Sequence, residues 1–256
     1  MLVIIGLIVG GIVVGKEMIV QATNRKMMSD FDKYFAAHNA FKLKYNCIAG
    51  DCAKASQYGL QVSNCNNEIF DDGLIGVNEA GYGPTAFRWG VEIIHFFRQL
   101  SASGMIGESY NSYTNCNAGQ GAYGAIEPGV TIPKMANNAG GFAPMMIGGI
   151  NYLRTGISKA TYSNVTIESN EYSFSPIEAL YISSKMSDGS PGFAGRKLYA
   201  TSRDAGGTPN NNQNTAPTFS VSGGTGCVVG SAPLASGQTF NTAISTRVCN
   251  LFIALP

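Results

Sequence analysis

Two helical patterns follow each other without a break in residues 1–45, which read MLVIIGLIVGGIVVGKEMIVQATNRKMMSDFDKYFAAHNAFKLKY. Residues 1–15 contain only apolar side chains and glycine, so they cannot form ordinary soluble surface. Further along, large residues recur at steps of four and three, which is the period of one helical face. These residues are Met27, Phe31, Tyr34, His38, Phe41 and Tyr45. The pattern predicts a single helix of about 45 residues.

The two parts of this helix need different surroundings. Residues 1–15 are apolar all round, so they must lie in lipid or among copies of the chain, whereas the striped part is amphipathic and packs on a globular domain. His38 lies on the stripe, and we interpret it as a packed core histidine. We therefore divide the chain into an apolar helix at 1–25 and a globular head at 26–256. Within the head we expect the amphipathic half of the helix at 26–46, a loop and helix region at 47–150 and a β-rich region at 151–256.

Four glycines in the apolar run form two pairs at a spacing of four residues, Gly6 with Gly10 and Gly11 with Gly15. Small residues at that spacing let neighbouring helices approach closely. Gly10 and Gly11 also mark the place where the helix melts most readily, because each glycine costs about 1 kcal/mol relative to alanine. The run lacks the basic region and the cleavage site of a secretory signal, so we expect it to be retained in the mature protein.

Six cysteines form an even set without a CxxC pair, and only two histidines accompany them. This combination argues against a zinc site and for three disulfides formed in an oxidising compartment. Among the possible connectivities we favour sequential pairing. The three predicted bonds are Cys47–Cys52, Cys65–Cys116 and Cys227–Cys249.

Composition and motifs argue against catalysis and nucleic-acid binding. Charged residues make up 13% of the chain and its net charge is +1, without the basic patch that nucleic acid requires. The GxGxxG match at 119–124 has neither the preceding strand nor the following helix of a dinucleotide site. Glu68, Asp71 and Asp72 fit a solvated turn better than a calcium site. We expect no enzyme activity and no cofactor, and note only a possible glycosylation sequon at Asn164.

Weaker patterns follow the long helix. A second helix is predicted from about Pro84 to Ser103, with a stop at Gly104. Its apolar face is expected at Phe87, Val91, Ile94, either Phe97 or Arg98, and Leu100. A short third helix is predicted at Pro176–Met186. Strands are predicted at about 142–154, 160–168, 195–201, 217–221, 226–230 and 244–255. The polar run at 205–218 is predicted to be an exposed loop. The expected fold class is therefore α+β, a long helix packed on an antiparallel sheet and fastened by disulfides.

Three blocks and a terminal run carry a resemblance to a known family. The first block covers about residues 2–52, with LVIIGLIVGGIVVGKEMI followed by FDKYFAAHNAFKLKYNCIAGDC. The second is WGVEIIHFFRQLSASGMIG at 89–107, and the third is FSPIEALYISSKMSDGSPGFAGRKLYA at 174–200. The terminal run TRVCNLFIALP follows as a last strand. Together these segments resemble type IV pilins and pseudopilins, the proteins with a prepilin-type cleavage and methylation segment.

The sequence departs from the family pattern in two places. The mature chain of a pilin begins with a methylated aromatic residue and carries a glutamate a few residues later, and neither is present near Met1. We therefore expect a few upstream residues with the processing site to precede this sequence. The acidic turn Ser187-Asp188-Gly189 also has one aspartate where relatives often have two.

The resemblance implies a structural subunit that is first inserted in the inner membrane and then polymerised by membrane assembly machinery into an extracellular helical filament on the cell surface, for adhesion or motility. The expected partner is thus the same chain, and nucleic acid is not. The expected contact residues are Ile4, Gly6, Leu7, Ile8, Val9, Gly10, Gly11, Ile12, Val13, Gly15 and Met18. Two alternatives remain open: a minor or secretion-type pseudopilin, and a membrane-tethered adhesin or ligand-binding module.

Overall fold

The computed structural model describes residues 2–60, 71–75, 91–110, 126–147, 150–157, 172–186, 198–201, 226–229 and 239–256. The helices are α1 (Leu2–Tyr45), the 3-10 helix η1 (Ala55–Tyr58), α2 (Val91–Ala102) and α3 (Pro176–Met186). The strands are β1 (Gly141–Ile147), β2 (Ile150–Ile157), β3 (Leu198–Thr201), β4 (Val228–Val229), β5 (Thr239–Phe240) and β6 (Asn250–Ala254). The fold is α+β, as predicted.

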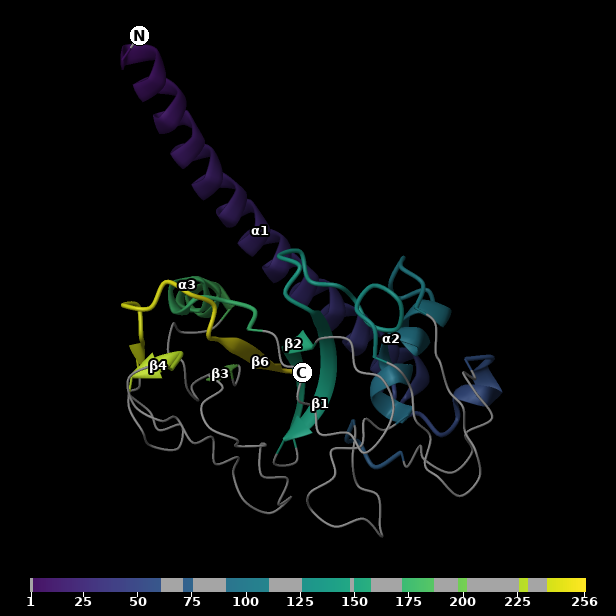
Figure 1. Cartoon of the computed structure of the whole chain (residues 1–256). Helices are drawn as coiled ribbons and strands as arrows, with labels where there is room; N and C mark the ends of the chain where they lie inside the picture. Colours follow the sequence, from purple (N-terminus) through teal and green to yellow (C-terminus); the bar gives the residue numbers. More distant parts are fainter. Residues whose placement is uncertain are drawn as a thin grey trace.

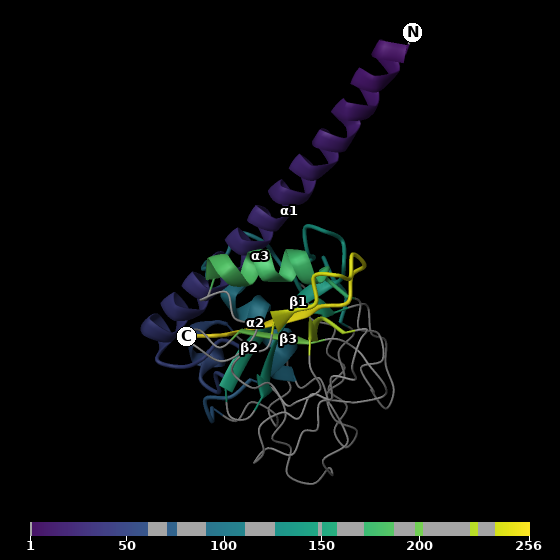
Figure 2. The same cartoon turned by 90° about the vertical axis from the view of Figure 1, so that its left-hand side faces the viewer.

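The long helix α1 is continuous over 44 residues, which confirms the length predicted from its two patterns. It passes through Gly10 and Gly11 without a break. Figures 1 and 2 show that its first half projects away from the rest of the chain and that its second half lies within a compact head. The N-terminus is at the far tip of the projection, and the C-terminus lies in the head.

The head contains a four-stranded antiparallel sheet in the order β1-β2-β6-β3, and β4 pairs with β5 in a second small sheet. The embedded half of α1 packs on β1, where the rings of Phe31 and Phe142 meet edge to face with centroids 5.1 Å apart. The same half packs on α2, where Tyr34 meets Phe97 at 5.2 Å. α3 lies beside α1 where the long helix enters the head (Figure 2). One aromatic core therefore joins the helix to the sheet.

The single strand predicted at 142–154 is wrong, because this region contains the two strands β1 and β2. They pair in antiparallel register, with Ile147 opposite Ile150. The dipeptide between these partners is Gly148-Gly149, a pair typical of two-residue hairpin connections. The predicted strands at 195–201, 226–230 and 244–255 contain the shorter β3, β4 and β6, whereas β5 was not predicted. The strands predicted at 160–168 and 217–221 lie outside the described residues.

Local capping explains the two shorter helices. Ser175 and Glu178 form a capping box at the start of α3, in which Glu178 Oε2 accepts a hydrogen bond from the Ser175 N–H at 2.8 Å. α2 ends at Ala102, and Gly104 terminates it: its φ of 72° allows the Met105 N–H to donate to the Leu100 carbonyl at 2.9 Å. The bounds predicted for α3 and the stop predicted for α2 are confirmed.

The core-facing side of α2 differs in part from the one predicted. Phe97 and Leu100 are fully buried as expected, but Ile93 and Phe96 are buried with them. Phe87 and the side chains of Val91 and Ile94 lie outside the described part. Polar His95 and Gln99 are also buried, and Gln99 Oε1 accepts a hydrogen bond from the Gly50 N–H at 2.7 Å. An apolar pattern alone could not locate this side, because polar residues share it.

Two disulfides are present among the described residues, Cys47–Cys52 and Cys227–Cys249. The first closes the loop directly after α1 and fixes the exit of the long helix. The second joins the residue before β4 to the residue before β6. Both bonds confirm the sequential pairing predicted for these four cysteines. Cys65 and Cys116 lie outside the described residues, as does Asn164.

Candidate functional site

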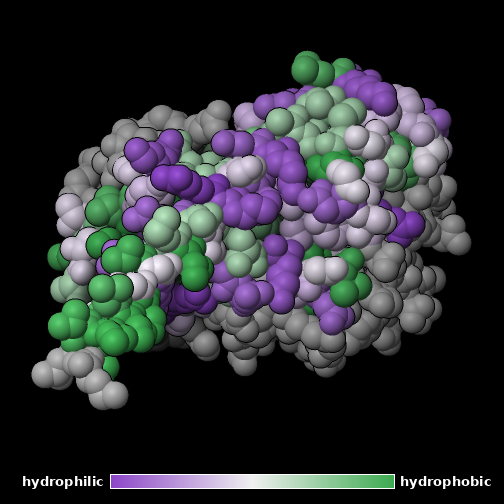
Figure 3. Space-filling model, turned by 90° about the horizontal axis from the view of Figure 1, so that it is seen from above, coloured by the Kyte–Doolittle hydropathy of each residue, from purple (hydrophilic) through white to green (hydrophobic). Residues whose placement is uncertain are grey.

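The projecting half of α1 is the most unusual surface of the molecule. We call residues 3–22 the bare segment, because all are exposed except Gly15, whose exposure is intermediate. The exposed fraction of its large apolar side chains runs from 38% at Val20 to 78% at Val3. Seen from above in Figure 3, hydrophobic atoms gather over this projecting end, and hydrophilic atoms cover much of the neighbouring head. Soluble monomers rarely expose a contiguous apolar surface of this extent, so the segment needs a partner.

The glycines of the bare segment leave its backbone open on more than one side. A Cβ placed on Gly6, Gly10, Gly11 or Gly15 would meet no atom within 4 Å. None of these glycines is therefore required by packing inside the chain. Their spacing instead offers two shallow depressions to a second helix.

Length and hydropathy make the same helix suitable for a membrane. It contains an 18-residue window with a mean hydropathy of 2.2, none of which is buried inside the chain. This uncovered window distinguishes the bare segment from a helix in the core of a domain. The bare segment is about 30 Å long at 1.5 Å per residue, which is close to the thickness of a hydrocarbon core. By length and composition the helix fits a membrane anchor or a signal segment.

The other half of α1, residues 24–45, is built into the head, and we call it the embedded segment. Its predicted stripe is confirmed, since Met27, Phe31 and Phe41 are fully buried and Tyr45 packs at the edge of the core. The first buried side chain is Asn24, close to the boundary predicted between residues 25 and 26. One turn of helix thus separates a surface without any cover from the core of the head.

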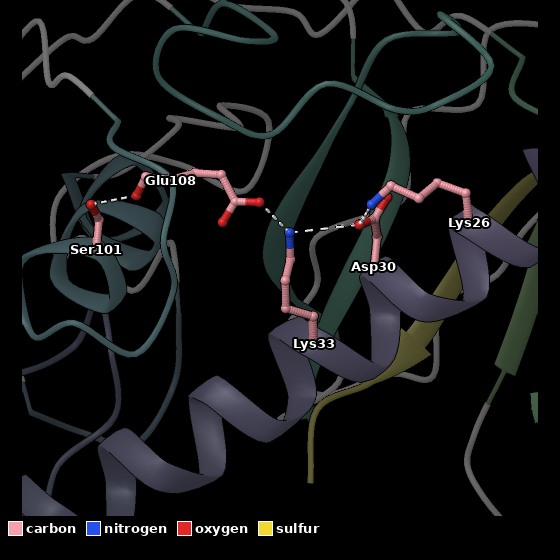
Figure 4. Close-up of polar contacts among 5 residues, drawn as sticks. All are labelled: Lys26, Asp30, Lys33, Ser101 and Glu108. Carbon is pink, nitrogen blue, oxygen red and sulfur yellow. Dashed lines mark hydrogen bonds and ion pairs between the residues drawn. The ribbon is translucent and has the colours of Figure 1, made fainter.

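A network of charges lies where α1 enters the head (Figure 4). Asp30 is nearly buried, and its Oδ1 atom forms ion pairs with Lys26 Nζ at 2.5 Å and with Lys33 Nζ at 3.6 Å. Lys33 also pairs with Glu108 at 2.5 Å, and this hydrogen bond lowers the pKa of Glu108. Ser101 Oγ donates to the Glu108 carbonyl at 2.6 Å. The network ties α1 to α2 and the loop after it, next to the point where the bare segment leaves the head.

The two histidines are core residues, as predicted for His38. Only 1% of either side chain is exposed. His38 stacks on Phe96 at 5.7 Å, and its burial, with a smaller effect of Lys42, lowers its pKa to about 4. Burial and then the charge of Arg98 lower the pKa of His95 to about 3. Neutral, enclosed imidazoles of this kind support packing.

The acidic turn predicted at Asp71-Asp72-Gly73 is held from two sides. Asp51 Oδ2 accepts a hydrogen bond from the Gly73 N–H at 2.7 Å, and Asn151 Oδ1 accepts one from the Ile75 N–H at 2.8 Å. Burial raises the pKa of Asp51 to about 6. No group of three His, Cys, Asp or Glu side chains suited to a metal ion occurs in the part of the chain that the structure describes. The carboxylate of Asp51 serves a backbone turn.

The contact residues predicted from the sequence all fall within the bare segment. The prediction missed Val3, Ile5, Val14 and Ile19, which are as exposed as the residues it named. The sequence could have predicted these four residues too, because in a run that is apolar all round every side of the helix is available for contact. The prediction also passed over Lys16 and Glu17, the charged pair inside the same surface.

The comparisons identify no relative of the chain. No protein-family model matches it, and neither a curated protein nor a solved structure is significantly similar to it.

Proposed function

We propose that this chain is a type IV pilin-like structural subunit, which polymerises through the bare segment into an extracellular helical filament. The observation that carries the proposal is the division of one continuous helix. Its embedded segment is part of the core of a disulfide-bonded head, and its bare segment is uncovered and apolar on all sides up to Gly15, before the charged pair Lys16 and Glu17. Outside a membrane, a helix of that kind needs a protein cover, and copies of the same helix supply one in a filament.

The size of the bare segment supplies a strong driving force for association. Covering one large aliphatic side chain contributes about 1.5–3 kcal/mol, and such side chains occupy most positions from Val3 to Val20. The loss of rigid-body freedom and the ordering of side chains offset part of this gain. The remainder is still large enough to hold a subunit in a polymer.

The same segment accounts for a membrane stage before assembly. We propose that the subunit waits in the inner membrane with the bare segment in the hydrocarbon core, and that membrane-bound assembly machinery extracts it into the filament. The head, with its disulfides, lies on the oxidising side of that membrane. The proposed role requires neither a cofactor nor a catalytic residue.

A charge in the bare segment tests this proposal. Ile8→Asp places a carboxylate in the middle of the proposed filament core and should abolish filaments in material sheared from cells that express the full chain, examined by electron microscopy. Leu43→Asp is the matched control, because Leu43 is an 87% exposed leucine of the same helix at its opposite end. Filaments that survive Ile8→Asp would contradict the proposal.

A second candidate function is that of a membrane-tethered binding module. The length of the bare segment, about 30 Å, favours it, because that length spans a bilayer without any second copy. In this case the wild-type chain would remain in the membrane fraction and give no filaments. A minor pseudopilin would also give none alone, but would enter filaments when a major subunit is supplied.

A further inference from the structure

The bare segment contains one pair of opposite charges, Lys16 and Glu17, and both side chains are exposed. No ion pair joins either of them to another residue in the described ranges of the chain. Neighbouring positions on a helix point about 100° apart, so the two side chains do not face each other. A surface that becomes covered would therefore leave both charges without a partner.

Each charge ends a different stripe of the helix. Residues at steps of four, three and four share one face, and Lys16 ends the bulky stripe Ile5, Val9, Ile12, Lys16. Glu17 ends a second stripe of the same spacing, which is displaced by one residue along the chain and starts with two glycines. This small stripe is Gly6, Gly10, Val13, Glu17. The two stripes lie side by side along the helix, and corresponding positions differ in height by one residue, about 1.5 Å.

The two stripes are complementary in shape as well as in charge. The positions beside Gly6 and Gly10 are empty, so the bulky side chains of Val9 and Ile12 from another helix fit against them. In that arrangement Lys16 of one copy lies opposite Glu17 of the next. A buried charge costs several kcal/mol unless it is paired, so this match decides which faces can meet.

We infer that the bulky stripe of one copy docks on the small stripe of the next, and that a Lys16–Glu17 ion pair between copies fixes the contact. The occupant of the bare segment is a second copy of this chain, and the argument for it is charge complementarity. The contact joins two different faces, so it repeats from copy to copy and cannot close as a two-fold dimer; an axial shift at each step makes the repeat an open helical polymer rather than a ring. This inference rests on the proposed function and specifies its interface.

The ion pair also sets the relative position of the helices. Lys16 and Glu17 differ in height by about 1.5 Å, the rise of one residue. Two copies that pair these residues along the stripes are parallel. One copy is shifted along the axis of the other by at most about one turn, or 5.4 Å, because the two side chains cannot bridge a longer shift. Packed helices usually have axes about 8–10 Å apart, and the glycines allow the axes of these two copies to lie closer than that.

Charge reversal tests the inference on the purified full chain, assembled by removing detergent and followed by sedimentation and electron microscopy. Lys16→Glu and Glu17→Lys should each raise the critical concentration for assembly at least about 100-fold, because every contact then holds two like charges. Lys54→Glu, an exposed reversal in the head, is the matched control and should assemble as the wild type does. The variants should unfold at the wild-type denaturant concentration, because both substituted side chains are exposed and take no part in the core of the described head.

Mixing the two single variants gives the sharpest result. Each variant alone carries one sign on both stripes, so an equimolar mixture should co-assemble into filaments that contain both chains in equal amounts. The double variant Lys16→Glu/Glu17→Lys should also assemble, since its two stripes are again opposite in sign.

The outcomes separate this inference from the proposed function. Single variants that assemble as readily as the wild type would overturn the inference and leave the proposed function intact. A mixture that stays unassembled, or that stops at closed dimers, would also overturn it. If the wild-type chain itself forms no filaments, the proposed function fails first.

Discussion

The bare and embedded segments of α1 share one helix axis and differ in everything that surrounds them. The embedded segment buries one stripe against the head and exposes charged residues such as Arg25 and Lys42 on the other side. The bare segment exposes aliphatic side chains on all sides. One side of a helix is enough to hold it in a domain, whereas a helix that is apolar all round must be covered from all sides. The partners of the bare segment therefore lie outside its own head.

The side chains of the two segments also differ in kind. The embedded stripe is rich in aromatic rings, which pack edge to face in a defined geometry, as Phe31 does with Phe142. The bare segment contains no aromatic residue and alternates branched aliphatic residues with glycine. Aromatic rings specify one partner in one position. Aliphatic ridges beside glycines suit contacts that repeat along a polymer.

The largest effect that separates the two segments comes from truncating a core ring. Phe31→Ala removes a fully buried side chain from the embedded stripe and should lower the free energy of unfolding of the head by about 3–5 kcal/mol. Ile8→Ala in the bare segment should leave that free energy unchanged, because Ile8 is exposed and lies outside the core of the described head. Guanidinium melts followed by near-UV circular dichroism measure both. Equal losses would show that the bare segment is part of the folded core.

Acid should also affect the embedded segment selectively, through His38. Burial lowers the pKa of His38 to about 4, from 6.5 when exposed, so the folded head prefers the neutral ring. The contribution of neutral His38 to the free energy of unfolding is therefore fully present above about pH 6.5 and is lost as the pH falls towards 4. The loss amounts to about 3 kcal/mol.

His38→Met keeps the volume and removes the titration. Between neutral pH and about pH 4 the free energy of unfolding should fall in both proteins, and the fall in His38→Met should be smaller than that in the wild type by about 3 kcal/mol. The remaining fall includes the contribution of His95, whose pKa is lowered to about 3. Ile8→Ala, the control in the bare segment, should follow the wild-type profile. Identical pH profiles for His38→Met and the wild type would contradict the assignment.

Replacing a glycine by alanine should have opposite effects in the head and in the bare segment, and both effects are smaller than that of Phe31→Ala. Gly50 has a φ of 90°, and a Cβ there would lie 2.4 Å from the Glu92 carbonyl oxygen. Gly50→Ala should therefore destabilise the head by roughly 2–3 kcal/mol. Gly10→Ala meets open space, so it should leave the head unchanged, favour the isolated helix by about 1 kcal/mol, and weaken assembly by keeping neighbours apart. If Gly10→Ala assembles at the same critical concentration as the wild type, neighbouring helices do not need to approach closely at Gly10.

The sequence predicted those features that depend on neighbours along the chain. The length of α1 followed from two patterns with the same period, and the start of α3 followed from a local capping box at Ser175 and Glu178. The bare segment could be predicted because its side chains allow no covered face. Such features need no knowledge of distant residues.

Features that depend on distant residues could not be predicted in this way. Asn151 donates to Gly73 and accepts from Ile75, and no local pattern connects β2 with that turn. The hairpin of β1 and β2 was missed for another reason: the Gly148-Gly149 dipeptide between the paired residues Ile147 and Ile150 is a local turn signal, and the prediction did not use it. The two-residue strand β5 is too short to carry a periodic signal.

The smallest predicted effect concerns the junction of the two segments. Glu108→Gln removes the ion pair with Lys33 and should lower the free energy of unfolding by only about 0.2–1 kcal/mol, because both side chains are partly exposed. Asp30 keeps its two lysine partners on α1, so the helix itself stays intact. What changes is the tie between α1 and the loop after α2. A spin-label pair placed on the bare segment and the head should therefore show a broader distance distribution in Glu108→Gln than in the wild type. An unchanged distribution would mean that the aromatic core, and not the charge network, sets the direction of the projecting helix.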